Sequence, residues 1–317
     1  MLYPLSYGGY TMRSMPRSAS ARCFSTVLRR SLPCKLHQAR SAACDARSLG
    51  RGLLPLSSGA YRGCYRSGIL SLHSSRQTTL WFVIPWLQDD SSFPPIENAL
   101  THPNGLLAAG GDLSPQRLIT AYRHGIYPWY SNDQPVLWWS PDPRMVLYTE
   151  EFRTSRSLAK RIRRGDYEVR IDTAFDEVIA ACAQAPRSEQ NGTWITRSIV
   201  DAYRRMHELG YAHSLEAWRD DELVGGLYGI ALGRVFFGES MFARESDASK
   251  VCLATLVSAL QQRGVPLIDC QQETQHLASM GARPIRRREF ASHLIELIHS
   301  NAAPKGWIAG PVRRLSE

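Results

Sequence analysis

The spacing of apolar residues changes along the chain and separates predicted helices from predicted strands. A helix is predicted after Ser114, because Ser114 can cap its N-terminus, Pro115 fits the first turn and Gly125 ends it. Its apolar face includes Leu118 and Tyr122. Similar patterns predict further helices at 155–164, at 173–183 with Thr173 as the cap, at 197–209, at 248–262 and at 288–298.

Three stretches have the pattern of β-strands. Residues 214–218 alternate between polar and apolar, and the apolar, Gly-rich stretch 223–238 predicts one or two more strands. Residues 266–271 predict a short buried strand. Because these elements do not alternate regularly as β-α-β-α, the pattern favours an α+β fold, with a mixed sheet flanked by helices, over a doubly wound fold.

Positive charge is concentrated at the start of the chain. Of the net charge of +9 over 317 residues, residues 1–79 carry +11, with eleven Arg, one Lys and a single acid, so residues 80–317 carry −2. Residues 1–79 also hold fourteen Ser and no apolar run that could build a core, so we expect a disordered basic extension. It is a transit peptide, a basic arm for nucleic acid, or the product of a start codon assigned too early. We favour the last over the first.

Several cofactors and locations are disfavoured by what the sequence lacks. No segment approaches the ~20 apolar residues of a membrane span. Cys182, Cys252 and Cys270 in residues 80–317 are widely spaced, which gives neither a disulfide framework nor a zinc site and suits a reducing cytoplasm. No Gly-rich phosphate-binding motif is present. We therefore expect no cofactor, no metal and no membrane partner.

Two regions have the composition of a nucleic-acid contact. Five large aromatic residues within 127–139 form either a small aromatic core or a wall on which a base stacks. The helix at 155–164 buries Leu158 and Ile162 and leaves basic residues on the rest of its surface. That surface is either an ordinary solvated face or a contact for a phosphate backbone.

Polar residues embedded in apolar strands are the candidates for chemistry. Glu239 closes an apolar run, and strand alternation places Asp269 and Gln271 on one face. A buried carboxylate is costly unless it is paired or hydrogen-bonded. The alternative to a functional role is therefore a buried ion pair of Asp269 with Arg244 or Lys250.

Six motifs, in order, resemble those of the bacterial leucyl/phenylalanyl-tRNA–protein transferase family. They are PNGLLAAGGDLSP at 103–115, GIYPW at 125–129, WWSPDPR at 138–144, GTWIT at 192–196, GESMF at 238–242 and LIDCQ at 267–271. The resemblance runs from about Trp86 to the C-terminus. It implies a cytoplasmic aminoacyltransferase that moves Leu or Phe, and weakly Met, from Leu-tRNA or Phe-tRNA to the N-terminal Arg or Lys of an acceptor protein. The product would be marked for N-degron proteolysis.

The resemblance also implies a small N-terminal α/β domain at 80–144 and an acetyltransferase-like (GNAT) catalytic domain at 145–317. By motif, Asp269 and Gln271 would hold and deprotonate the attacking amine, with Asp269 as base or electrostatic anchor, and Glu239 would orient the donor's α-amino group. One departure is Thr274, where the family often has Asn. The remaining implied sites are Tyr122, Trp129 and Trp194 around the tRNA 3′ adenosine and donor, Leu227, Phe236, Met241 and Phe242 in an apolar donor pocket, and Arg156, Lys160, Arg163 and Arg164 on tRNA.

Two other functions remain as alternatives. An acyl-CoA N-acyltransferase on the same fold would need a Gly-containing pyrophosphate loop before the long helix, and residues 242–247 contain no glycine. A non-enzymatic tRNA-binding module would keep the basic helix but would not need Asp269.

Overall fold

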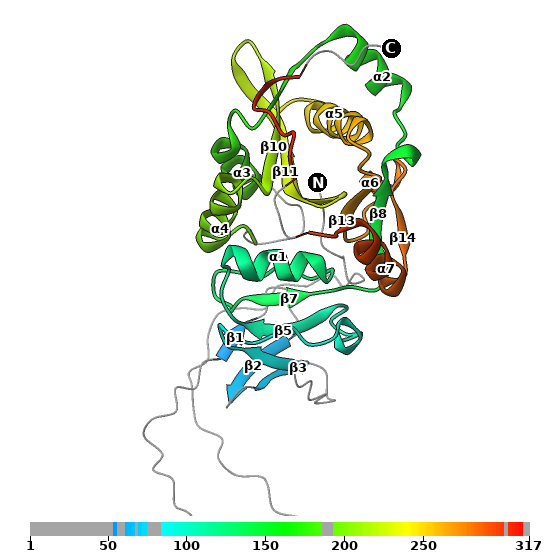
Figure 1. Ribbon diagram of the computed structural model, residues 1–317. Helices are drawn as coiled ribbons and strands as arrows, with labels where there is room; N and C mark the ends of the chain where they lie inside the picture. The colour runs from blue at the N-terminus through cyan, green and yellow to red at the C-terminus, as the bar shows by residue number, and fades with distance from the viewer. Residues whose placement is uncertain are drawn as a thin grey trace, which may run out of the picture. The chain divides into compact units, whose positions relative to one another are not determined.

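Two β-sheets organise the part of the chain that the structure describes. This computed structural model describes residues 84–185, 193–300 and 304–312, together with the backbone of three earlier strands (Figure 1). The first sheet has the strand order β1-β2-β3-β4-β5-β7-β6. Its strands are β1 (Leu53–Pro55), β2 (Tyr61–Arg66), β3 (Ile69–Ser74), β4 (Ile84–Leu87), β5 (Leu106–Gly110), β6 (Tyr127–Pro128) and β7 (Leu137–Trp139).

The second sheet has eight strands in the order β14-β8-β13-β12-β11-β10-β9-β15. Neighbouring strands in it are antiparallel, except that β12 and β13 are parallel. This arrangement confirms the predicted mixed sheet and the α+β class. The strands are β8 (Arg144–Tyr148), β9 (Glu168–Ile171), β10 (Ala212–Arg219), β11 (Glu222–Leu232), β12 (Val235–Ala243), β13 (Leu267–Gln271), β14 (Arg283–Ile285) and β15 (Gly310–Pro311).

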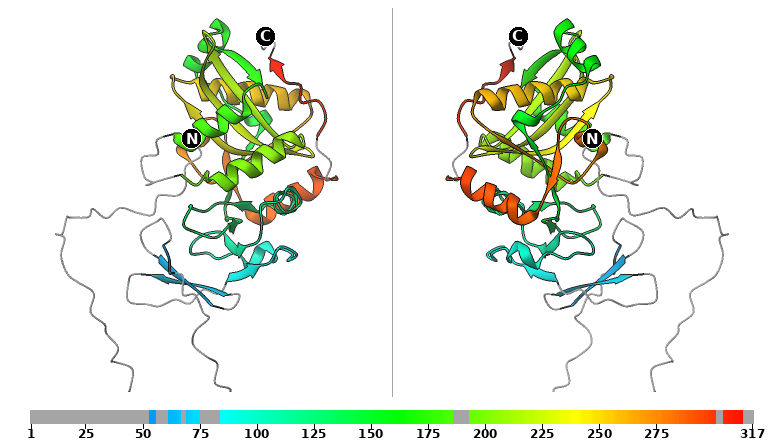
Figure 2. Two further views of the ribbon diagram at one scale, coloured as in Figure 1. Left: turned by 90° about the vertical axis from the view of Figure 1, so that its left-hand side faces the viewer. Right: turned by 90° about the vertical axis from the view of Figure 1, so that its right-hand side faces the viewer.

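Helices cover both faces of the eight-stranded sheet. Helix α5 packs on β10 and β11 from one side, whereas α3 packs on β11 and β12 and α4 on β10 from the other; the left view of Figure 2 looks onto α3 and α4. The helices are α1 (Pro115–Arg123), α2 (Arg156–Arg164), α3 (Phe175–Gln184), α4 (Arg197–Glu208), α5 (Ala248–Gln262), α6 (Gln275–Ala278) and α7 (Arg287–Leu297), with 3₁₀ turns at Ile96–Asn98 and Thr149–Glu151.

Strand alternation divides the apolar residues of this sheet between two cores. Tyr228 and Ile230 of β11 face the core that contains α3 and α4, and this core continues into the first sheet. Leu227 and Ala231 of the same strand face the core that contains α5. Because side chains of a strand alternate between its faces, one apolar strand supplies both cores.

Most predicted helix ends are found where the sequence placed them. The Ser155 hydroxyl accepts a hydrogen bond from the Leu158 backbone N–H at 3.2 Å, and Gly165 ends α2 with a φ of 65°. The predicted cap of α3 is wrong, because α3 begins after Ala174 without a side-chain cap. Thr173 instead donates its hydroxyl to the buried Glu216 carboxylate at 2.9 Å.

The predicted disordered extension, residues 1–79, lies outside the described residues except for the backbone of β1, β2 and β3. Of the helices that the structure describes, none has both the length and the apolar character that a membrane crossing requires.

Candidate active site

Two β-bulges on neighbouring strands place the polar residues of the candidate site. In the β11–β12 ladder Tyr228 faces Ser240 and Gly229 faces Gly238, so Glu239 is the additional residue of a bulge. A similar shift in the β13–β8 ladder follows Asp269, and Gln271 there has a φ of 63°. Bulges interrupt the alternation of side chains and redirect them. Strict alternation therefore does not describe how Asp269 and Gln271 are placed.

The bulge at Glu239 depends on a glycine in the facing strand. A Cβ atom at Gly229 would lie 2.2 Å from the carbonyl oxygen of Phe237 and 2.5 Å from the Phe236 ring. No side chain can be accommodated at that distance, so only glycine lets β11 approach the bulged strand closely enough to keep the ladder.

The Glu239 carboxylate lies at the centre of a buried hydrogen-bond network. Its Oε1 accepts from the Tyr122 hydroxyl at 2.7 Å and from Gln271 Nε2 at 2.9 Å, and its Oε2 accepts from the Tyr203 hydroxyl at 3.0 Å. The two tyrosine hydroxyls also contact each other. Helices α1 and α4 and strand β13 thus each contribute a donor to the one carboxylate that β12 carries.

Burial shifts the proton affinity of this network. Desolvation raises the pKa of Glu239 to about 7, although the hydrogen bonds from Tyr122 and Tyr203 act in the opposite direction. Burial, together with the nearby Glu239 charge, also raises the pKa of both tyrosines well above the usual value. Near neutral pH the tyrosines are therefore hydrogen-bond donors, and Glu239 can exist with or without its proton.

Asp269 is held by a second buried network next to the first. Arg144 of β8 donates two hydrogen bonds to its carboxylate, from Nε to Oδ1 at 2.8 Å and from Nη2 to Oδ2 at 2.6 Å. Arg144 also donates to the carbonyl of Gly125 at 3.0 Å and lies over the Tyr127 and Phe290 rings. Although burial by itself lowers it, the pKa of Arg144 is raised by Asp269, so Arg144 keeps its charge in this buried site.

Gln271 connects the two networks. Its backbone N–H donates to Asp269 Oδ1 at 2.9 Å, and its side chain reaches Glu239. An ionised carboxylate only accepts hydrogen bonds, so the Gln271 amide must turn Nε2 toward Glu239 and its carbonyl oxygen away. Asp269 therefore fixes the backbone of the residue whose side chain reaches Glu239.

An apolar pocket lies between β12 and α5, and its lining includes Gly238 and Ser240, the chain neighbours of Glu239. It is lined by three of the predicted pocket residues, Leu227, Phe236 and Met241, together with groups from α5, β13 and α6. Its volume is about 20 Å³, room for about one water molecule. Phe242, the fourth predicted residue, does not line this pocket but a neighbouring cavity that shares Met241.

The aromatic residues of 127–139 form the small core that the sequence left open as one alternative. Tyr127 and Trp138 are almost completely buried in the core that includes Tyr122, and Trp194, 8% exposed, lies in the same core. Trp129 is partly buried and packs edge-on against Trp139, with 5.3 Å between ring centroids. Trp129 is thus the most accessible of the three residues expected around the 3′ adenosine and donor, because Tyr122 and Trp194 are buried.

Comparison with known proteins decides between the alternatives. The family model "Leucyl/phenylalanyl-tRNA protein transferase" matches residues 146–295, and its N-terminal domain model matches 111–142. The transferase of Nitrosospira multiformis is 57% identical over 225 residues, which cover 71% of this chain and 97% of that protein. That of Azoarcus sp. is 60% identical over 225 residues, covering 71% and 95%. The chain belongs to the leucyl/phenylalanyl-tRNA–protein transferase family. It is therefore an aminoacyltransferase.

The solved structures that align with this transferase do not assign its fold further. The structure of L-PGS from Bacillus licheniformis aligns with a TM-score of 0.31 and 12% identity, over 68% of this chain and 66% of that chain. A TM-score this low carries no argument about function or fold.

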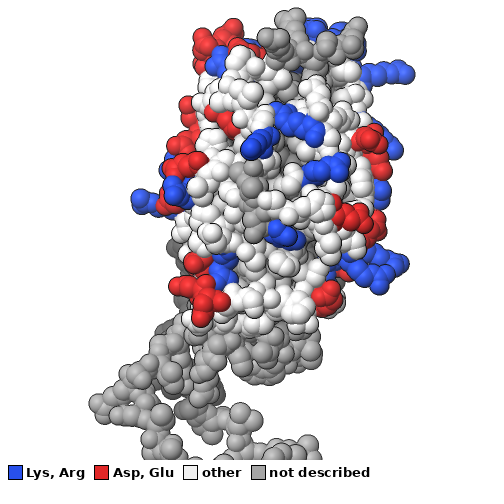
Figure 3. All heavy atoms as spheres, viewed as in Figure 1, with Lys and Arg blue, Asp and Glu red and all other residues white. Residues whose placement is uncertain are grey.

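The basic helix of the transferase presents its charges to solvent. Leu158 is buried, whereas Arg156, Lys160, Arg163 and Arg164 are exposed, and Arg164 forms an ion pair with Asp166 at 3.2 Å. In the space-filling view, Lys and Arg side chains occupy the middle of one face, and Asp and Glu lie mostly toward its edges (Figure 3). The net charge of −2 on residues 80–317 therefore coexists with local positive surface.

The sequence missed three side chains of the transferase site. Asp269 is paired with Arg144, not with Arg244 or Lys250, because Arg144 lies on the strand adjacent to β13. Arg244 donates to the Leu223 carbonyl, and Lys250 pairs with Asp247. Tyr203 could have been found from the sequence, because its hydroxyl is the polar group on the buried face of α4. Tyr127 and Arg144 both occur in the family motifs, but no role was assigned to them.

The described residues contain no group of three or more His, Cys, Asp and Glu side chains that could hold a metal ion. Cys182, Cys252 and Cys270 are buried free thiols. Burial raises the pKa of Cys252 and of Cys270, which lies between Asp269 and Gln271, so neither is an activated nucleophile.

Proposed function

We propose that this chain transfers Leu or Phe, and Met more weakly, from aminoacyl-tRNA to the N-terminal Arg or Lys of an acceptor protein. The observation that carries the proposal is the buried Glu239 carboxylate, held by Tyr122, Tyr203 and Gln271, together with an apolar pocket lined by Gly238 and Ser240, its neighbours in the chain. The aminoacyl group of the donor carries an ammonium next to an apolar side chain. A carboxylate can pair with that ammonium, and an apolar pocket can take up the side chain. The added residue would mark the acceptor for N-degron proteolysis.

Glu239 is the proposed partner of the donor's α-amino group. A carboxylate has about four lone-pair sites, and three are used by the two tyrosines and Gln271, which leaves one on Oε2. Desolvation raises the pKa of Glu239 to about 7, and an incoming ammonium stabilises the ionised form. Binding of the charged donor therefore offsets the cost of a buried carboxylate.

The apolar pocket is the proposed site of the donor side chain. Leu227, Phe236 and Met241 line it, and because its volume is only about 20 Å³ these side chains must move apart to admit Leu or Phe. Methionine is flexible and adapts to different occupants. Apolar pockets discriminate by only ~1–3 kcal/mol per methylene, which is the reason for expecting weak transfer of Met.

Gln271 is the proposed contact for the attacking amine. Its carbonyl oxygen points away from Glu239 and takes part in no hydrogen bond among the described residues, so it can accept from the amine N–H. Asp269, with both oxygens engaged by Arg144, has a positioning role in this proposal, because it holds the Gln271 backbone rather than the amine. This narrows the expected role of Asp269 to that of an electrostatic anchor.

The proposed reaction requires no external oxidant or activating group. The neutral amine nitrogen attacks the ester carbonyl carbon, the C–N bond forms, and the C–O bond to the tRNA ribose breaks. The leaving ribose oxygen takes one proton, which the amine supplies. An α-amino group has a pKa of ~7.7–8.0, so neutralising it near pH 7 costs only about 1–1.4 kcal/mol, whereas orientation can supply ~7–11 kcal/mol.

The exposed basic residues of α2 are the proposed contact for the tRNA phosphate backbone, and Trp129 and Trp194 are proposed to stack on its 3′ adenosine. We also propose that residues 80–144 form the small N-terminal domain and 145–317 the GNAT-like domain. The change from one sheet to the other between β7 and β8 supports this boundary. Because the donor is a charged tRNA, the proposed activity takes place in the cytoplasm.

The test is transfer by the purified full chain from labelled Leu-tRNA and Phe-tRNA to peptides that differ only in their first residue. Label should appear on peptides that begin with Arg or Lys and not on those that begin with Met. Binding of charged tRNA without transfer to any peptide would refute the proposal and favour a tRNA-binding module.

A further inference from the structure

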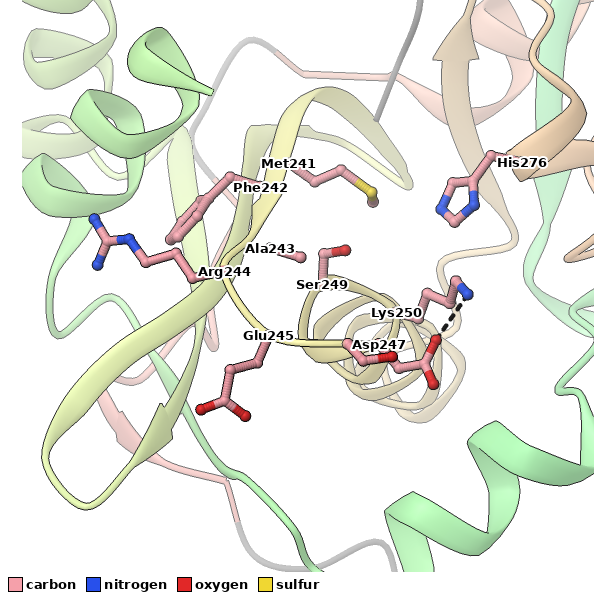
Figure 4. Close-up of a pocket in the computed structure, with 10 residues that line it drawn as sticks. Met241, Phe242, Ala243, Arg244, Glu245, Asp247, Ser249, Lys250 and His276 are labelled. Carbon is pink, nitrogen blue, oxygen red and sulfur yellow. Dashed lines mark hydrogen bonds and ion pairs between the residues drawn. The ribbon is translucent and has the colours of Figure 1, made fainter. Parts of the chain in front are cut away.

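A second cavity, of about 460 Å³, lies at the C-terminal end of β12 and the N-terminal end of α5 (Figure 4). Its walls come from the stretch 241–250 and from His276 of α6. Neither the apolar donor pocket nor the Glu239 network accounts for this cavity. It is the larger of the two cavities beside β12.

The cavity is lined by hydrogen-bond donors that are not fully used. Lys250 Nζ donates to Asp247 Oδ1 at 2.7 Å, which leaves two of its three N–H groups. The Nε2 atom of His276 has no hydrogen-bond partner among the described residues. Burial lowers the pKa of His276 to about 4, so the ring is neutral near pH 7 and Nε2 donates in the tautomer that carries its proton there. The first turn of α5 adds the Ser249 hydroxyl and backbone N–H groups without intrahelical partners. Figure 4 shows Lys250 and His276 on the same side of the space and Arg244 pointing away from it.

The carboxylates of this cavity are already paired with cations. Asp247 accepts from Lys250 through Oδ1 and pairs with Arg161 through Oδ2 at 3.5 Å. Glu245 pairs with Arg219 and accepts from the Tyr167 hydroxyl at 3.2 Å. A cationic ligand would have to displace these partners, whereas an anionic ligand finds donors with spare capacity. The observations therefore favour an anion over the basic side chain of an acceptor protein.

The position of the cavity indicates which anion. At one end it shares Met241 with the apolar donor pocket. At the other end Asp247 is joined to Arg161 of α2, the helix whose remaining basic residues are exposed. An RNA strand whose aminoacyl end lies in the donor pocket and whose stem contacts α2 would cross this cavity between the pocket and the helix. The backbone of such a strand is a chain of phosphodiesters.

We propose that this cavity binds the phosphodiester backbone of the single-stranded 3′ end of the donor tRNA, through Lys250, the first turn of α5 and His276. The proposal rests on the proposed transferase function. Thr274 contributes indirectly, because its hydroxyl accepts from the Leu277 backbone N–H at 3.2 Å and so caps the short helix that carries His276. Thr274, the residue that departs from the family pattern, is thus compatible with the placement of His276.

The experiment compares two minimal donors in transfer to an Arg-starting peptide. One is 3′-leucyl adenosine, which has no phosphodiester, and the other is the 3′-leucyl ester of the trinucleotide CCA. The wild-type full chain should use the trinucleotide with the higher kcat/KM. Lys250→Gln should lower kcat/KM for the trinucleotide roughly tenfold, the usual effect of losing one charge-assisted hydrogen bond, and change that for the nucleoside less than about twofold.

Two further variants complete the test. Lys305→Gln is a matched control, because Lys305 is an exposed lysine that does not line the cavity, and it should leave both donors unaffected. His276→Ala should repeat the selective loss of Lys250→Gln to a smaller extent, independently of any effect of Lys250 on folding. Equal losses with both donors, equal use of both by the wild type, or a changed KM for the peptide alone would each overturn the proposal. Absence of transfer by the wild type from these donors and from Leu-tRNA alike would instead refute the proposed transferase function.

Discussion

Arg144 and Asp269 form a bidentate ion pair whose side chains are only 1% and 0% exposed. The pair joins β8 to β13, and through the Gln271 backbone N–H it determines where the Gln271 amide reaches Glu239. Asp269, which the motif suggested as a base, thus belongs to the framework that positions Gln271. The following predictions test this framework and the roles proposed around it.

Replacing Asp269 should affect stability and turnover together. Asp269→Ala leaves the Arg144 guanidinium buried without its partner, which costs ~3–5 kcal/mol of unfolding free energy. The remaining folded enzyme should lose far more turnover than tRNA affinity, because Gln271 loses its anchor whereas α2 is unchanged. Urea unfolding, single-turnover transfer and tRNA binding measure the three quantities.

Asp269→Asn separates positioning from proton transfer. If Asp269 positions Gln271, the variant turns over more slowly, but its turnover depends on pH in the same way as that of the wild type. If Asp269 is instead the general base, the acidic limb of the pH profile should disappear in the variant. That second result would contradict the positioning role.

The pH dependence of stability should report on Glu239. Burial raises its pKa from 4.5 to about 7 in the folded state, so the folded protein binds a proton more tightly than the unfolded chain. The resulting stabilisation is complete below pH ~4.5 and is lost as the pH rises through about 7. Glu239→Gln should remove this component, on the order of 3 kcal/mol, from urea unfolding measured between pH 4.5 and 8. Identical curves for both proteins would show that Glu239 titrates normally.

The exposed surface of α2 should contribute to tRNA affinity and not to chemistry. Arg163→Ala is expected to weaken binding of charged tRNA and to make its salt dependence shallower by about one ion, while turnover of bound tRNA stays within twofold. Arg288→Ala on α7 is a matched control, because Arg288 is also exposed and has no role in the proposal. A change of the same size in both variants would mean that the effect arises from net charge alone.

The apolar pocket should set the preference among donors. Leu227→Ala removes methyl groups from its wall, so the larger Phe side chain should gain relative to Leu by ~1–3 kcal/mol, roughly 5- to 150-fold in the ratio of kcat/KM values. Competition between Phe-tRNA and Leu-tRNA in one reaction measures the ratio directly. No change in the ratio would place the donor side chain elsewhere.

The sequence by itself determined the local structure and most of the candidate site. Caps such as Ser155 and end glycines such as Gly165 act through backbone atoms a few residues away, so α2 is readable from its own residues. The apolar strands also revealed Glu239, Asp269 and Gln271 as polar residues that needed an explanation. The motifs established the family, which the comparisons confirmed.

Only the tertiary structure decided which partners these residues have. Arg144 lies 125 positions from Asp269, and Tyr122 lies 117 positions from Glu239, so no local pattern couples them. The bulges that redirect Glu239 and Gln271 arise from the register between strands, which depends on the facing strand as much as on their own. The sequence gives the chemistry of each side chain. The packing of distant elements decides which partners the buried carboxylates of Asp269 and Glu239 have, and therefore whether each is an anchor or a ligand contact.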